Sequence, residues 1–129
     1  MATVIDHTIV PTIVPTIGRE KSVEFYTRIF GFEDPGEVGL VLAVRVNDTF
    51  NLDFRDTEDF LSIHYAFAMD AEEFEAAFSR IKEASIPYGD GPRTQENMKG
   101  PGMTAGAKGQ RKAIYFKGPS GHVLEIKTY

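Results

Sequence analysis

Apolar positions recur along the first half of the chain in the patterns of strands and of an amphipathic helix. Thr3–Thr12 is β-branched and apolar and predicts a strand. Glu20–Phe30 places apolar side chains at helical spacing, with charged side chains on the remaining face. After a turn signal at Asp34–Gly36, the apolar runs Leu40–Val46 and Phe50–Phe54 predict a hairpin.

The second half repeats this order of elements. Leu61–Met69 predicts a strand, and Ala71–Ala84 predicts a helix with an aspartate before it as N-cap. A last hairpin is predicted from the runs Arg111–Phe116 and His122–Thr128. The pattern therefore predicts a strand, a helix and a hairpin in the first half, and the same order of elements in the second half.

Between the second helix and the last hairpin the periodicity disappears. Residues Pro87–Gln110 contain six glycines and three prolines but few large apolar residues, which predicts a long loop. Its glycine-rich part, Gly89–Gly109, lacks the strand–loop–helix context of a phosphate-binding motif. We expect this segment to border the site as a mobile lid. The alternatives are a dimer contact or a solvated connection.

An internal repeat relates the two halves. Phe25–Ile29 aligns with Ala77–Ile81, and a histidine lies early in the strand before each helix, His7 in the first half and His64 in the second. We therefore predict an α+β fold of two βαβββ modules within a single domain, module 1 spanning about 1–58 and module 2 about 59–129. Each module is expected to form a curved, mixed, mostly antiparallel sheet, with one helix against its convex side.

One irregularity interrupts the repeat. Tyr26 lies 19 residues after His7, whereas Phe78 lies 14 residues after His64. The sequence Ile-Val-Pro-Thr occurs twice in succession at 9–16, and removing one copy reduces the first separation to 15. A tandem duplication therefore accounts for most of the difference.

Composition limits the classes of function. The 129 residues are 42% hydrophobic and 12% aromatic, enough for one globular core, and no apolar stretch is long enough to span a membrane. The net charge of −5 argues against nucleic acid and anionic membrane surfaces as partners. The absence of cysteine excludes disulfides and thiolate metal sites. We expect a cytoplasmic protein that acts on a small molecule, as a homodimer because a module of about sixty residues buries little surface alone.

Three residues are candidate metal ligands. Glu125 interrupts the apolar strand Val123–Ile126, and charged residues in such places are usually paired or bound to metal. Two imidazoles and a carboxylate, here His7, His64 and Glu125, form a common ligand set for Zn, Mn, Fe or Ni. The alternative is two surface histidines and an ion-paired glutamate. His122 is expected on the opposite face, in a packing or hydrogen-bonding role.

Several segments together resemble the vicinal oxygen chelate superfamily, which includes glyoxalase I, bleomycin-resistance proteins, fosfomycin-resistance thiol transferases and extradiol dioxygenases. The resemblance spans nearly the whole chain. It is specific for the superfamily and much weaker for any one activity. The matching segments are Asp6–Thr8, Ser22–Phe32, His64–Phe67 and Tyr115–Glu125.

The resemblance implies that His7, His64 and Glu125 hold a divalent metal ion in a concavity that the curved sheets form. It implies an enzyme that binds a small oxygen-bearing substrate by bidentate chelation, as a lyase or isomerase, a thiol transferase or a dioxygenase. The alternative is a non-catalytic drug- or metabolite-binding protein of the bleomycin-resistance type, because such members share the fold without metal.

Two further positions follow from the resemblance. Tyr115 is similar to a substrate-contacting tyrosine of the fosfomycin-resistance proteins, with cross-strand packing as its alternative role. A glyoxalase-like site uses a fourth protein ligand in the first half, which aligns with about Leu52 and has Asn51 and Asp53 beside it. The sequence leaves open which of the two polar residues approaches the site.

Overall fold

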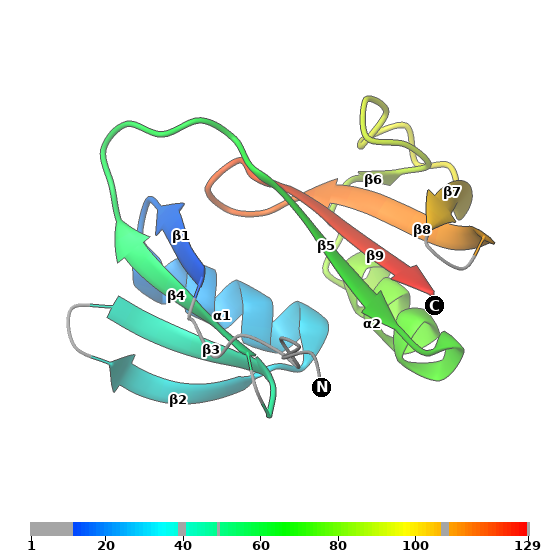
Figure 1. The fold of residues 1–129 in the computed structure, drawn as a ribbon. Coiled ribbons are helices and arrows are strands. Elements are labelled where there is room, and N and C mark those ends of the chain that lie inside the picture. The colour runs from blue at the N-terminus through cyan, green and yellow to red at the C-terminus, as the bar shows by residue number, and fades with distance from the viewer. Residues whose placement is uncertain (1–11, 39–40, 49, 107–108, 129) are drawn as a thin grey trace, which may run out of the picture. The chain divides into compact units, whose positions relative to one another are not determined.

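The computed structural model describes residues 12–38, 41–48, 50–106 and 109–128 (Figure 1). The chain divides into two compact units, 1–60 and 61–129. Each unit contains one helix and one sheet of mixed strand direction, which confirms the predicted α+β fold. No helix in the described ranges is long and apolar enough to cross a membrane.

Unit 1 is a four-stranded sheet with one helix. The strand order is β1-β4-β3-β2, in which β1 runs parallel to β4 and the other neighbours are antiparallel. The elements are β1 (Thr12–Thr16), α1 (Arg19–Phe30), β2 (Glu33–Val38), β3 (Val41–Asn47) and β4 (Phe50–Asp56).

Unit 2 repeats this plan with additional strands. Its order is β5-β9-β8-β6, β7 pairs with β8, and β5 runs parallel to β9. The elements are β5 (His64–Met69), α2 (Ala71–Glu83), β6 (Tyr88–Gly89), β7 (Gly102–Gly106), β8 (Gly109–Lys117) and β9 (Val123–Thr128).

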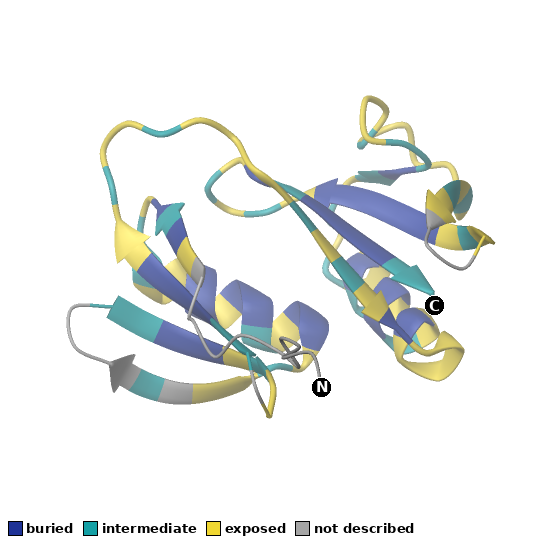
Figure 2. Ribbon diagram, in the orientation of Figure 1, coloured by how far each residue is buried: buried dark blue, intermediate teal, exposed yellow. Residues whose placement is uncertain are grey.

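Each helix buries one stripe of side chains, as its periodicity predicts. Figure 2 shows the buried positions on one side of each helix. In unit 1 the ring of Tyr26 lies 4.8 Å from that of Phe54, which is fully buried in β4. Burying such a side chain contributes about 1.5–3 kcal/mol. The buried helix residues include Val23, Tyr26, Ile29 and Phe30 in α1, and Phe74, Phe78 and Ile81 in α2.

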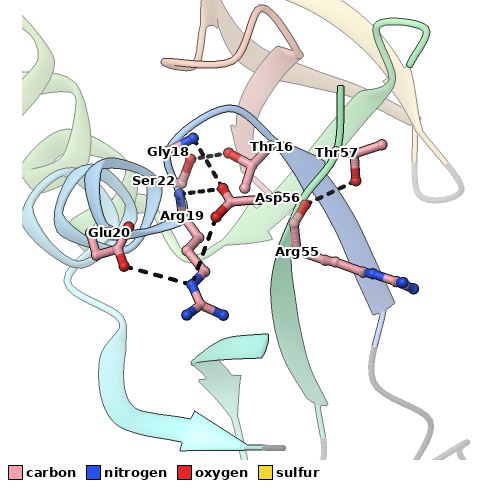
Figure 3. Close-up of polar contacts among 8 residues, drawn as sticks. All are labelled: Thr16, Gly18, Arg19, Glu20, Ser22, Arg55, Asp56 and Thr57. Atoms are coloured by element: carbon pink, nitrogen blue, oxygen red, sulfur yellow. Dashed lines mark hydrogen bonds and ion pairs between the residues drawn. The ribbon is translucent and has the colours of Figure 1, made fainter. Parts of the chain in front are cut away.

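The two helices begin in different ways. In α2 the carboxylate of Asp70 accepts a hydrogen bond from the backbone N–H of Glu73 at 2.8 Å, which confirms the predicted N-cap. The start of α1 has no local side-chain cap. Instead, Asp56 at the end of β4 accepts hydrogen bonds from the backbone N–H groups of Gly18 and Arg19 at 3.1 and 2.9 Å (Figure 3).

The first strand differs from its predicted range. The prediction was Thr3–Thr12, of which residues 3–11 lie outside the described residues, whereas β1 runs over Thr12–Thr16 and so uses the second copy of the duplicated sequence. Two residues connect β1 to α1 and one connects β5 to α2. After one copy of the duplicated sequence is removed, the histidine-to-helix separation is still one residue longer in unit 1 than in unit 2. The longer connection between β1 and α1 accounts for this residue.

Two loop predictions were partly wrong. Asp34–Gly36, predicted as a turn, lies inside β2 at a register shift, where the Asp34 carboxylate accepts a hydrogen bond from the Gly36 N–H at 2.8 Å. The predicted loop Pro87–Gln110 contains β6 and β7, both paired with β8. Cross-strand pairing imposes strand geometry on glycine-rich sequence whose local propensity is low.

Candidate metal centre

The strongest polar cluster lies on unit 2, where β5 and β9 run side by side. The His64 imidazole Nε2 lies 3.0 Å from Oε1 of Glu125. The side chain of His64 is 44% exposed, whereas that of Glu125 is 6% exposed. Two of the three predicted ligands are therefore in contact, one buried in the sheet and the other open to solvent.

Strand alternation places Glu125 on the face opposite the helix. Its neighbours Leu124 and Ile126 are fully buried, while Glu125 pairs across the sheet with Ala66 of β5 and Tyr115 of β8. We call the face that carries His64, Glu125 and Tyr115 the site face. The predicted orientation of Glu125, away from the helix, is thus the observed one.

One of the two carboxylate oxygens of Glu125 has no hydrogen-bond partner among the described residues. Oε1 meets His64, but Oε2 is buried and has no hydrogen-bond partner within the described part of the chain. A buried charged oxygen without a partner costs free energy, and a bound cation removes that cost. A carboxylate oxygen and an imidazole nitrogen are also donors that divalent transition metals accept. These two residues fit a metal ion.

Tyr115 lies beside this pair. Its ring meets the His64 imidazole edge-on, with centroids 5.9 Å apart, and its side chain is buried. Burial raises the pKa of the Tyr115 hydroxyl, and a hydrogen bond with Thr104 lowers it. The negative charge of Glu125 and a hydrogen bond to its carboxylate raise it. The net effect is upward, so the phenol remains protonated and can donate a hydrogen bond.

Sequence reasoning missed Thr104. It belongs to β7, inside the segment predicted as a loop, and no local pattern marks it as part of a site. β7 pairs with β8, the strand of Tyr115, and a hydrogen bond from Thr104 lowers the pKa of the Tyr115 hydroxyl.

The third predicted ligand, His7, lies outside the described residues. Among the residues that the structure describes, no three histidine, aspartate or glutamate side chains converge to hold a metal ion. The pair His64 and Glu125 is the part of the predicted triad that the structure places.

Unit 1 has a carboxylate at the position of Glu125. In β4 the buried run Leu52, Asp53 and Phe54 matches the run around Glu125 in β9, and Asp53 likewise pairs with a strand on each side. Asp53 is therefore the counterpart, one residue beyond the alignment at Leu52. Burial raises the pKa of Asp53, and its Oδ1 has no hydrogen-bond partner in the described ranges.

His122 has a structural role, as predicted. It is 2% exposed, and its Nδ1 accepts a hydrogen bond from the backbone N–H of Ile63 at 3.0 Å. The ring of Tyr65 meets it edge-on at 5.4 Å. Burial raises the pKa of the Tyr65 hydroxyl. Both side chains stabilise the entry to β5.

The fold and this cluster agree with the similarity to known proteins. Residues 5–126 match the model of the Glyoxalase/Bleomycin resistance protein/Dioxygenase superfamily. The chain belongs to this superfamily. The match covers both units, including the strands that carry His64, Tyr115 and Glu125.

Individual superfamily members resemble the chain at modest identity. Metallothiol transferase FosB from Shouchella clausii (strain KSM-K16) is 26% identical over 117 residues, which cover 84% of this chain and 71% of the relative. FosB from Lysinibacillus sphaericus (strain C3-41) is 25% identical over 123 residues, with 84% and 73% covered. The solved structure of oxidase ChaP-H2 has a TM-score of 0.83 and 28% identity, over 97% of this chain and 95% of that one.

Proposed function

We propose that this protein is a metal-dependent enzyme of the superfamily that acts on a small oxygen-bearing substrate, which the metal chelates through two oxygens. The observation that carries the proposal is the contact between His64 and the buried Glu125 at 3.0 Å, with Oε2 of the same carboxylate left without a partner in the described residues. His7, His64 and Glu125 would hold the ion. A divalent ion supplies Lewis acidity that stabilises negative charge on substrate oxygens.

The chain's own residues define where the substrate would bind. On the site face of β5, His64 is followed by Ala66 and Ala68, all three exposed, so small side chains leave room beside the imidazole. Tyr115 keeps its proton because its pKa is raised, and it would donate a hydrogen bond to a substrate oxygen. Thr104 would hold the phenol in position.

The relatives support a reaction at metal-held oxygens rather than one particular product. The similar proteins include a metallothiol transferase and an oxidase, whose names imply different chemistry. We therefore propose the shared step, chelation and polarisation of a small oxygen-bearing molecule, as the function. The alternative, a non-catalytic binding protein of the bleomycin-resistance type, is an outcome of the test below.

We also propose that the protein works as a homodimer in the cytoplasm. The absence of cysteine fits a reducing compartment. Units of about sixty residues bury too little surface to be robust alone. Light scattering at micromolar concentration tests the dimer, and a stable monomer would contradict it.

Metal analysis of the purified protein tests the central proposal. We expect Mn²⁺ or Zn²⁺ to bind at one ion per chain, and His64→Ala to lose most of that metal while the protein stays folded. The matched control is Glu75→Gln, which removes an exposed carboxylate on α2 and should bind metal as the wild type does.

Two results would contradict the proposal. Stoichiometric metal in His64→Ala would exclude the predicted ligand set. A folded wild-type protein that binds no metal at millimolar Mn²⁺ or Zn²⁺, yet binds small molecules, would favour the non-catalytic alternative.

A further inference from the structure

The site face of unit 2 continues beyond the pair His64 and Glu125. Because successive side chains of a strand alternate between its two faces, Lys127 lies on the same face as Glu125, two residues further along β9. The neighbouring strands agree with this placement, since Lys127 pairs with Ala68 of β5 and with Ala113 of β8. Two residues of a β-strand span about 7 Å. A basic side chain therefore lies one step of the strand from the buried carboxylate.

Small side chains lie beside both ends of this stretch. Ala66 pairs with Glu125, and Ala68 pairs with Lys127. Both alanines are exposed, as is His64 at the start of the same strand. An alanine side chain extends only one carbon from the sheet, so it leaves space above β5 for a small molecule. The space runs from the imidazole of His64 to the position of Lys127.

The charge of Lys127 is not neutralised within the described part of the chain. The residue is half-buried and forms no ion pair with a described carboxylate. Glu125 on the same strand contacts His64 instead, at 3.0 Å. Another lysine of the site face, Lys117, differs in this respect, because it forms an ion pair with Glu96 at 3.6 Å. A positive charge that is partly withdrawn from water and has no counter-charge attracts an anion.

Arg111 adds a second positive charge at this end of the face. It lies two residues before Ala113, which pairs with Lys127, so the two basic residues are diagonal neighbours on adjacent strands. Its Nη1 donates a hydrogen bond to the backbone carbonyl of Gln110 at 2.9 Å, and its Nε is buried without a partner in the described ranges. No described carboxylate pairs with this guanidinium. The two side chains therefore make this end of the site face positive.

The available donors suit a carboxylate better than a phosphoryl group. Sites for phosphoryl groups commonly use a helix N-terminus or a nest of backbone N–H groups. Around Lys127 the backbone cannot serve in this way, because β9 pairs with a strand on each side and its N–H groups are used in the sheet. A single ammonium group balances the one negative charge of a carboxylate and donates charge-assisted hydrogen bonds to it.

We propose that Lys127 binds a carboxylate of the substrate, at the end of the site face away from His64. The substrate is then a small acid whose carboxylate lies about 7 Å from the oxygens that the metal chelates, one step along β9. Lys127 determines the specificity for this group, and the charge of Arg111 strengthens the attraction. The carboxylate subsite lies wholly on unit 2. Only the chelated end of the substrate rests on the proposed function.

Two hydroxamates that differ by one carboxylate test the subsite. Acetohydroxamate and succinate monohydroxamate chelate a metal through the same two oxygens, but only the second carries a carboxylate at its far end. Titration calorimetry gives both dissociation constants for the protein at saturating Mn²⁺. We expect succinate monohydroxamate to bind about tenfold more tightly, the effect of one charge-assisted contact. Added KCl should reduce this advantage, because salt screens charges that are open to solvent.

Variants of the basic residues locate the contact. Lys127→Met keeps the length of the side chain but removes its charge, so the two dissociation constants should come within about twofold of each other. Lys127→Arg keeps the charge and should restore most of the difference. Arg111→Gln should reduce the tenfold difference to about fivefold, because this charge acts from further away. The matched control is Lys112→Met on the opposite face of β8, where Lys112 pairs with Glu75 at 3.6 Å; it should keep the full difference.

The outcomes separate this subsite from the proposed function. Equal affinities of the wild type for the two probes, or an undiminished difference in Lys127→Met, would overturn the subsite and leave the proposed function standing. A wild type that binds neither Mn²⁺ nor acetohydroxamate would contradict the proposed function. The subsite is then tested on the metal-free protein, where succinate monohydroxamate at high millimolar concentration should shift the NMR amide signals of residues 125–128 and acetohydroxamate should not. Equal shifts with the two probes, or none, would overturn the subsite there as well.

Discussion

β4 of unit 1 and β9 of unit 2 have the same buried pattern, with a carboxylate between two apolar residues. In β9, Glu125 lies between Leu124 and Ile126; in β4, Asp53 lies between Leu52 and Phe54. Glu125 meets the imidazole of His64 at 3.0 Å, whereas Asp53 has no hydrogen-bond partner for its Oδ1 among the described residues.

The neighbouring parallel strand causes this difference. Beside Glu125, β5 carries the small residue Ala66, and His64 lies two residues earlier on the same face. Beside Asp53, β1 carries Ile13, whose side chain has no hydrogen-bonding group, and the residue two positions earlier in the sequence is Pro11 rather than a histidine. A carboxylate at a given place in this sheet becomes a metal-binding candidate only when the next strand supplies an imidazole. The comparison teaches that strand register, as much as residue identity, builds the site.

The largest expected contrast concerns metal affinity. Glu125→Gln should lower the affinity for Mn²⁺ by more than the roughly 10–100-fold that loss of an outer-shell contact costs, because it removes a charged ligand. Asp53→Asn should change this affinity less than about threefold, since the 10–100-fold losses arise when a residue that hydrogen-bonds a metal ligand is removed. Titration calorimetry of both variants measures this. Equal losses would make Asp53 a ligand as well and remove the contrast between the units.

The second contrast concerns the helix starts. Asp56→Ala removes the oxygen that accepts from two N–H groups of α1, and an ion-pair partner as well, and should cost about 1–2 kcal/mol. Asp70→Ala removes an acceptor for one N–H group and should cost about 1 kcal/mol. Urea denaturation gives these free energies. Hydrogen exchange should quicken in 19–30 for the first variant and in 71–83 for the second. Asp59→Ala, which changes an exposed aspartate after β4, is the control. Faster exchange in both helices for either variant would show that the caps are not local to their units.

The smallest contrast concerns the pH dependence of stability. Because burial raises the pKa of Asp53 above 3.8, its ionised form destabilises the folded state at neutral pH. Asp53→Asn should therefore raise the free energy of unfolding at pH 7, by up to about 1 kcal/mol. This gain should shrink as pH falls through the raised folded-state pKa and vanish below the unfolded value of 3.8. Thermal melts from pH 7 to pH 3 measure it, and a loss of stability at pH 7 would show that Asp53 is paired.

The sequence alone determined the features that depend on local periodicity and local capping. Four features follow from spacing along the chain: the stripes of α1 and α2, the cap at Asp70, the hairpin of β3 and β4, and the orientation of Glu125 away from the helix. Neighbouring residues fix these features, so the pattern is sufficient. The superfamily followed from the same residues, because they stand at motif positions.

Tertiary structure decided what depends on partners far away in the sequence. Thr104 belongs to β7, which pairs with the strand of Tyr115, and Asp56 caps α1 because β4 ends beside Gly18. Local propensity carries no information about such partners. The register of β1 is the extreme case: its five residues occur twice, so the sequence is equally compatible with both placements. Only the pairing with β4, which follows much later in the sequence, shows that the copy at Thr12–Thr16 forms this strand.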